Sequence, residues 1–245
     1  MQRFPKGFQA VVIGASRGIG EALVAALRAR GAGRVWAGCR QPPSQSADVG
    51  VVPLAVDVTC EDSLASAAAT VAAAGGTVSL VMHTPGLLSA PGLRPERRLE
   101  DVRAEALRHS FSVNAFGPIL AARAFVPLLQ HGEAAVFASL SARVGSIGDN
   151  RLGGWYAYRA AKAAQNQLIH TLAIEAARRS PALICCTLHP GTVDTGLSRP
   201  FQGNVPAARL FSPARAAGQL LDVVDRLTPE DRGACLAWDG QRIPW

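Results

Sequence analysis

A phenol and an ammonium group lie four residues apart in the stretch GGWYAYRAAKAAQNQL, residues 153–168. A helix would place Tyr158 and Lys162 on one face, because residues four apart are neighbours on a helical surface. A free phenol has a pKa of about 10, and a nearby cation lowers that pKa toward neutrality. The pair could therefore exchange protons with a bound molecule, for which the surrounding alanines leave room. The alternative is a coincidental pair on an exposed helix.

A glycine-rich segment, GASRGIG, lies between an apolar run and a helical stretch near the start of the chain. Gly14, Gly18 and Gly20 lack the Cβ atoms that would keep a backbone away from pyrophosphate. The helix that follows offers free N–H groups and the positive end of its dipole to an anion. An ordinary glycine turn is the alternative, but a strand before and a helix after the loop favour dinucleotide binding.

The choice between nicotinamide cofactors depends on the end of the second apolar run, AGCRQPP. An NAD site usually has an Asp or Glu there, which binds the ribose hydroxyls. This sequence has Arg40 instead, and Arg17 lies within the glycine loop. Two guanidinium groups can hold an adenosine 2′-phosphate through charge-assisted hydrogen bonds. The pattern favours NADP(H); the alternative is two solvated surface arginines.

Short apolar runs alternate with helical stretches along the whole chain. The expected strands are residues 8–14, 34–39, 51–58, 78–84, 134–141, 182–190 and 234–240, and the expected helices are residues 19–30, 62–74, 99–109, 114–130, 155–179 and 213–227. The strands are almost continuously apolar, as in a parallel sheet covered on both faces. The alternation predicts an α/β fold, a Rossmann-type doubly wound parallel sheet with helices on both faces, in one domain of residues 1–245. The irregular segments 84–98 and 197–212 would then overhang the carboxyl ends of the strands, where ligands bind.

Composition excludes several other classes of protein. Hydrophobic residues make up 49% of the chain, no apolar run is as long as a membrane span, and the first residues lack a secretory signal. The five cysteines are scattered without metal-binding spacing, which indicates reduced thiols in a cytoplasmic protein and no metal site. The net charge of +7 comes from dispersed arginines. We therefore expect an anionic small ligand or a scattered positive surface rather than nucleic-acid binding.

Together, five motifs closely resemble those of the short-chain dehydrogenase/reductase family, in order over nearly the whole chain. They are GASRGIG, SVNAFGP, ASLSARVG, the Y-x-x-x-K pair and HPGTVDT. The segments GSIGDNRLGGWYAYRAAKAAQN and WDGQRIPW resemble the branch that contains Sniffer-type carbonyl reductases and C-factor-like proteins. The resemblance implies an NAD(P)(H)-dependent oxidoreductase. It also implies a homodimer formed through the helices that start near Asn114 and Trp155.

The family's Asn–Ser–Tyr–Lys active site corresponds to Asn114, Ser141, Tyr158 and Lys162. The resemblance implies that Tyr158 protonates a carbonyl oxygen, while Lys162 lowers its pKa and binds the nicotinamide ribose. Asn114 would hold a water in the proton relay, or alternatively cap or kink its helix. The implied cofactor-binding residues are Gly14, Ser16, Arg17, Gly18, Ile19, Gly20, Arg40, Asp57, Val58, Thr84, Gly86, Tyr158, Lys162, Pro190, Gly191, Thr192, Val193 and Thr195. Asp57 would lie beside the adenine, or else cap a strand end.

The sequence departs from the family pattern at two places. The family motif S-S-x-x-G puts Ala142 where the second serine is expected, so Ser141 is chosen from its place at the strand end, with Ser139 and Ser146 as alternatives. The segment HTPG replaces the family's N-N-A-G. His83 or Thr84 could supply the bracing bonds of the missing amides; a catalytic role for His83 is the alternative.

The leading hypothesis is an NADPH-dependent reductase of aldehydes or ketones, or an enzyme that catalyses the reverse oxidation of alcohols. The main alternative is a nucleotide-binding signalling or scaffold protein of the C-factor type with little turnover. The sequence does not name the substrate. A mostly apolar pocket, or simple packing between loops, is indicated by Leu87, Leu88, Leu93, Trp155, Leu197, Phe201 and Phe211.

Overall fold

Seven parallel strands form one sheet in the order β3-β2-β1-β4-β5-β6-β9. The computed structural model describes residues 1–90 and 92–245, without the side chain of residue 204. The strands are β1 (Gln9–Ile13), β2 (Arg34–Cys39), β3 (Val51–Ala55), β4 (Val78–His83), β5 (Ala135–Leu140), β6 (Leu183–His189) and β9 (Cys235–Ala237). The order reverses between β1 and β4, and crevices at such switch points bind ligands in doubly wound sheets.

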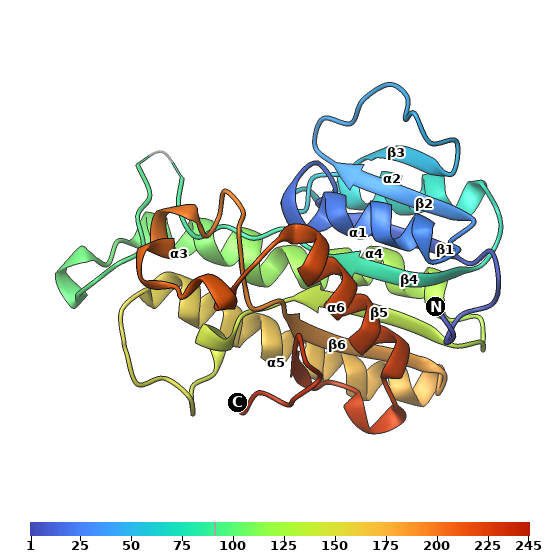
Figure 1. Ribbon diagram of the computed structural model, residues 1–245. Coiled ribbons are helices and arrows are strands. Elements are labelled where there is room, and N and C mark those ends of the chain that lie inside the picture. The colour runs from blue at the N-terminus through green and yellow to red at the C-terminus, as the bar shows by residue number, and fades with distance from the viewer. Residues whose placement is uncertain (91) are drawn as a thin grey trace.

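Helices cover both faces of the sheet (Figure 1). The helices are α1 (Gly18–Ala29), α2 (Glu61–Ala73), α3 (Ala104–Phe111), α4 (Gly117–Phe125), α5 (Tyr156–Arg179) and α6 (Pro213–Arg226). Helices α1 and α6 pack together on one face, and α2, α4 and α5 cover the other. The predicted fold class, a Rossmann-type α/β sheet, is confirmed.

The core has two apolar layers, one on each side of the sheet. On the α4/α5 side, Phe125, Phe137 and Ile169 are fully buried together. On the α1/α6 side, Leu23 and Leu220 pack against the opposite face of the same strands. This double burial explains why the strand sequences are apolar at almost every position. It also gives the carboxyl ends of the strands a rigid base.

Several element boundaries differ from the expectations. The expected strand 51–58 ends at Ala55, and the expected helix 99–109 divides into a 3-10 turn, η1 (Leu99–Asp101), and α3. The expected helix 114–130 begins with a π-helical turn, η2 (Ser112–Phe116), and ends in a 3-10 turn, η3 (Val126–Leu129). Pro127 contributes to that ending because it has no N–H to donate. A short strand pair, β7 (Thr192–Val193) and β8 (Leu210–Phe211), was not expected.

Residues 104–129 form one helical stretch that is long and apolar enough to cross a membrane by length and composition alone. Half of its most apolar window is buried inside the fold. Core helices of globular proteins have the same character, so this single stretch is weak evidence for a membrane span.

Candidate active site

Helix α5 starts with a tight turn that fixes the first helical residues. Gly153, Gly154 and Trp155 have positive φ angles, and Trp155 caps the helix at φ 52°. The Trp155 amide donates to the backbone oxygen of Glu96 at 2.6 Å. The Ala157 amide donates to Glu96 Oε2 at 3.3 Å. These bonds fasten the turn that carries Tyr158 to the irregular segment before η1.

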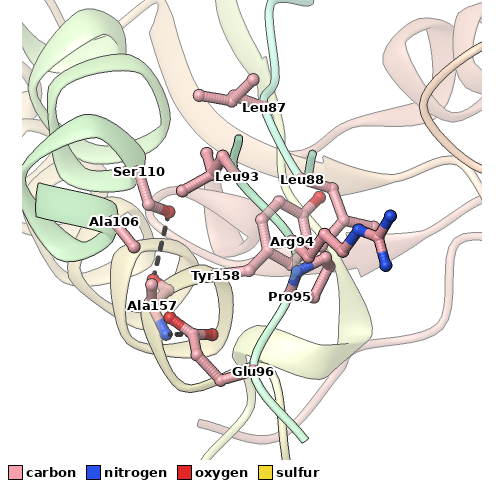
Figure 2. Close-up of a pocket in the computed structure, with 10 residues that line it drawn as sticks. All are labelled: Leu87, Leu88, Leu93, Arg94, Pro95, Glu96, Ala106, Ser110, Ala157 and Tyr158. Carbon is pink, nitrogen blue, oxygen red and sulfur yellow. Dashed lines mark hydrogen bonds between the residues drawn. The ribbon is translucent and has the colours of Figure 1, made fainter. Parts of the chain in front are cut away.

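Tyr158 lies at the centre of a pocket at the carboxyl end of the sheet (Figure 2). The pocket is lined by Leu87, Leu88, Leu93, Arg94, Pro95, Glu96, Ala106, Ser110, Ala157 and Tyr158. Trp155 stacks edge-on against both Tyr158 and Phe201, with ring centroids 6.4 and 5.0 Å away. Within the described part of the chain, the Tyr158 hydroxyl makes no hydrogen bond. Its apolar neighbours include three of the four leucines that the sequence indicated; Leu197 does not line this pocket.

Burial raises the pKa of Tyr158. This shift is opposite in sign to the expected one, because the loss of water around the phenolate outweighs any attraction from Lys162. Lys162 Nζ lies 5.8 Å from the centre of the Tyr158 ring. The predicted pair is therefore brought together, but the phenol remains protonated at neutral pH.

Lys162 is buried on the sheet side of α5. Its Nζ donates to Leu140 O and to Gln165 Oε1, each at 2.8 Å. Burial lowers the pKa of Lys162 to about 7. The ammonium is thus held between Leu140 at the end of β5 and Gln165 on its own helix. Only a small change in its surroundings would change its charge.

Asn114 lies in the π-helical turn η2 and is fully buried. Its Oδ1 accepts from Leu87 N at 2.8 Å, and its Nδ2 donates to Leu87 O at 2.7 Å and to Ser110 Oγ at 3.1 Å. The side chain therefore fixes the start of the pocket-forming segment. Asn114 does lie in a distorted helix, as its alternative interpretation held, and π-turns often occur at functional sites.

The three candidate serines have different surroundings. Ser139 Oγ is bonded to His83 and Gln165, and Ser146 Oγ accepts from Asp149 N. Ser141 is buried, its amide donates to Leu188 O at 2.8 Å, and its Oγ has no partner among the described residues. Of the three, Ser141 is therefore the one whose hydroxyl has no hydrogen-bond partner among the described residues.

His83 and Thr84 brace the end of β4 on both sides. His83 Nδ1 lies 3.0 Å from Ser139 Oγ on β5, and Thr84 Oγ1 donates to Ile13 O on β1 at 2.8 Å. Burial, and then the charge of Lys162, lower the pKa of His83 to about 3. These contacts supply the cross-strand bonds that the sequence indicated, and they give His83 a structural role.

The glycine loop between β1 and α1 has the geometry of a phosphate cradle. Gly14 has φ 90°, and a Cβ there would come within 2.5 Å of Thr84 Oγ1. A Cβ on Gly20 would overlap Gly14 O, and one on Gly18 would lie 3.1 Å from Thr195. Among the described residues, no side chain caps the start of α1. The first N–H groups of the helix can therefore bind an anion.

The two arginines expected to bind a 2′-phosphate are both exposed. In the described part of the chain, neither Arg17 nor Arg40 forms an ion pair. Asp57 Oδ1 accepts from the Thr59 amide at 2.9 Å and from its hydroxyl at 2.7 Å. These bonds, more than Arg40, lower the pKa of Asp57. Asp57 therefore holds the turn that follows β3, and its place beside the adenine stays a prediction.

The other expected cofactor residues lie after β1, β3, β4 and β6. Gly191 has φ 78° and is backed by Phe211, where a Cβ would come within 2.7 Å of the ring. Gly86 borders Asn114, and Val58 packs under Gly117. The exposed Ser16 lies in the loop before α1, the half-buried Ile19 lies in the first turn of α1, and Pro190, Thr192, Val193 and Thr195 follow β6.

The sequence interpretation missed three polar residues at this site: Glu96, Ser110 and Gln165. Gln165 follows Lys162 by three residues, so it lies on the same helical face. Its place on the buried side of a core helix was the available signal, because a buried amide needs hydrogen-bond partners. Glu96 and Ser110 gave no such signal, since their burial depends on how the irregular segment folds back.

The family assignment follows from comparison with known proteins. Residues 9–205 match the family model of the short chain dehydrogenases. The chain belongs to this family and is an oxidoreductase by membership, as its motifs predicted. The 1-hydroxy-2-glutathionyl-2-methyl-3-butene dehydrogenase of Rhodococcus sp. strain AD45 is 31% identical over 239 residues, covering 96% of this chain and 98% of that protein.

Three further proteins, of the kinds that the sequence resembled, are similar to this chain. The C-signal protein of Myxococcus xanthus is 33% identical over 147 residues, covering 60% of this chain and 83% of that protein. The NADPH-bound carbonyl reductase from chicken fatty liver has a TM-score of 0.86 and 27% identity, covering 98% of this chain and 100% of that one. Carbonyl reductase Sniffer of D. melanogaster has a TM-score of 0.85 at 22% identity with the same coverage, which shows a shared fold.

Proposed function

We propose that this protein is an NADPH-dependent reductase of aldehydes or ketones, which also catalyses the reverse oxidation. The observation that carries the proposal is the placement of Tyr158. Its phenol lies in an apolar pocket at the carboxyl end of the sheet, 5.8 Å from the Lys162 ammonium measured at the ring centre. Its hydroxyl is left without a partner among the described residues.

The glycine loop and its surroundings fit nicotinamide adenine dinucleotide phosphate, NADP(H). The glycine loop leaves no space for Cβ atoms, and the uncapped start of α1 offers N–H groups to a pyrophosphate. Arg17 and Arg40 are exposed and available for a 2′-phosphate, where a carboxylate would repel it. The similar chicken carbonyl reductase binds NADPH. When bound, this cofactor supplies the hydride that reduces a carbonyl carbon.

The chain's own residues then handle the proton. The raised pKa keeps Tyr158 protonated at neutral pH, the form in which it donates to a carbonyl oxygen. A protonated Lys162 stabilises the phenolate that remains. Ser141 offers its unused hydroxyl to the carbonyl, Asn114 holds the segment at Leu87 in place, and the leucines exclude water.

The test is NADPH oxidation with a panel of aldehydes and ketones. The panel includes a carbonyl compound linked to glutathione, because the Rhodococcus relative is named for a glutathionyl substrate and Arg94 on the pocket wall could bind a carboxylate. We expect Tyr158→Phe to lower kcat by about 10²- to 10⁴-fold. NADPH binding, measured by fluorescence, should remain within twofold. Unchanged turnover in this variant would refute the proposal.

A nucleotide-binding signalling role is the second candidate. It is favoured by the similarity to C-signal and by Ala142, which stands at the family's serine offset. Its signature would be tight NADPH binding, no reduction of any carbonyl in the panel, and no effect of Tyr158→Phe in cells.

We further propose that the protein is a cytoplasmic homodimer with residues 1–245 as one domain. All five cysteines are free thiols. Two apolar side chains on the α4/α5 side, Phe116 and Ile174, are about half exposed, and a second copy would cover them. Analytical ultracentrifugation should show a dimer that Ile174→Glu dissociates; a monomeric wild-type protein would contradict this.

A further inference from the structure

A chain of buried hydrogen bonds runs from Lys162 to the middle of the sheet. Lys162 Nζ donates to Gln165 Oε1 at 2.8 Å, and Gln165 Nε2 donates to Ser139 Oγ at 2.7 Å. Ser139 Oγ lies 3.0 Å from His83 Nδ1. Gln165, Ser139 and His83 are all fully buried. The chain therefore links α5 to β5 and β4 without any contact with water.

The bond directions start from Lys162, because its ammonium can only donate: the Gln165 oxygen faces it, and Gln165 Nε2 donates to Ser139 Oγ. The Ser139 hydroxyl then donates to His83 Nδ1 in the neutral tautomer that carries its proton on Nε2, which has no partner among the described residues. The second proton of Gln165 Nε2 goes to Leu140 O at 3.1 Å. With both protons used, the amide oxygen of Gln165 faces the ammonium.

We propose that Gln165 is a positioning residue that holds the Lys162 ammonium at the active site, and that Ser139 and His83 fix which end of its amide meets Lys162. A reversed amide would bring its N–H groups against the ammonium. Leu140 O alone would then be left as the protein acceptor for a buried charge, which costs free energy. The catalytic consequence rests on the proposed function, but the positioning itself does not.

The charge of Lys162 should therefore depend on Gln165. Burial already lowers the pKa of Lys162 to about 7. The titratable groups that face it are Tyr158 on its own helix, His83 on β4 and Cys235 on β9. His83 is neutral, and burial raises the pKa of Cys235, so neither supplies a full opposite charge. The amide oxygen of Gln165 is thus a main stabiliser of the charged form.

The sequence makes this charge directly measurable. Of its 25 basic residues, only Lys6 and Lys162 are lysines, the rest being arginines. Lys6 is exposed. Protein labelled with ¹³C at the lysine ε-carbon gives two NMR signals, and Lys6→Arg identifies the one from Lys162. A pH titration of that signal reports the pKa of Lys162 without any enzymatic turnover.

Three substitutions test the proposal. Gln165→Leu removes the acceptor and should lower the pKa of Lys162 by about one to two units, as expected for a hydrogen bond to a charged group. Gln165→Glu keeps an acceptor, adds a negative charge, and should raise that pKa by at least one unit. The matched control is Gln167→Leu. Gln167 is exposed on the same helix and its side chain donates to Thr171, so this substitution should leave the pKa of Lys162 unchanged.

Both outcomes of the titration are decisive. If the pKa of Lys162 stays within about 0.3 units in folded Gln165→Leu and Gln165→Glu, the proposal is wrong; if Gln165→Leu does not fold, Gln165→Glu alone decides. In the carbonyl assay, the pH at which kcat/KM changes should shift in the same direction as the titration. A shifted titration with no effect of Tyr158→Phe on turnover would refute the proposed function while leaving the positioning role intact.

Discussion

Substitution of Gly145 by alanine should displace helix α5, which carries Tyr158 and Lys162. Gly145 ends the turn after β5 and is buried against α5. A Cβ at this position would lie 2.7 Å from Lys162 Cβ and 2.9 Å from the Lys162 carbonyl carbon. The backbone of Gly145 has no positive φ, so steric overlap, rather than backbone strain, sets the effect.

The size of the displacement follows from those distances. Ordinary contact begins at 3.4 Å, so a separation of 2.7 Å requires the helix or the turn to move by about 0.7 Å. Overpacking of this kind costs about 1–3 kcal/mol of stability. A misplacement approaching 1 Å at reacting groups can lower a rate by about 10²-fold. We therefore expect Gly145→Ala to fold with reduced stability and to lose most of its carbonyl reduction.

Urea unfolding and NADPH oxidation measure the two effects. The matched control is Gly218→Ala in the interior of α6, where a Cβ would meet only Arg30 Nη2 at 3.9 Å. This variant should gain about 0.5–1 kcal/mol from helix propensity and keep its rate. If Gly145→Ala matches wild type in both unfolding midpoint and kcat/KM, the packing argument for Lys162 is wrong.

Two further predictions concern charge. Replacing either Arg17 or Arg40 with serine should lower the preference for NADPH over NADH, measured as the ratio of the two kcat/KM values, by roughly five- to tenfold. The control, Arg178→Ser, changes an exposed arginine at the far end of α5 and should leave the ratio unchanged. An unchanged ratio in the Arg17 and Arg40 variants would argue against 2′-phosphate binding. Folding lowers the pKa of His83 from 6.5 to about 3. Between these two pH values the unfolded state binds more protons than the folded state, so the free energy of unfolding should decrease as the pH falls from 6.5 to about 3. Urea midpoints of His83→Asn should show a flatter pH dependence than wild type, and parallel curves would contradict a buried neutral histidine.

The strands of the sheet were predicted well because a run of apolar residues in the sequence is a local signal. Continuous apolar runs such as 34–39 became strands with identical bounds, and the spacing of Tyr158 and Lys162 was enough to place both on one face of α5. At Asn114 the sequence indicated only a cap or kink as an alternative; the side chain in the π-helical turn bonds to Leu87, which is distant in sequence and gives no local signal. The pair β7 and β8 joins residues too far apart in sequence to give a local pattern.

The pKa of Tyr158 shows where reasoning from spacing ends. Four residues of helix determine how near a cation lies, but they do not determine how much water surrounds the phenol. That depends on how residues 87–88 and 93–96 fold back to line the pocket that contains the ring. The burial of Glu96 depends on the same segment and was therefore not predicted from the sequence. One partner of the Lys162 ammonium, Leu140 O, likewise lies on β5, which is distant in the chain.

The bonds from Glu96 to the start of α5 have a practical consequence for redesign. Glu96 belongs to the pocket wall and also anchors the turn that carries the phenol. Replacing this wall segment with one from another protein, to admit new substrates, should therefore tilt Tyr158, the proposed proton donor, as well as reshape the cavity. Libraries that vary residues 87–94 but retain Glu96 should yield altered selectivity without loss of turnover more often than libraries that replace it.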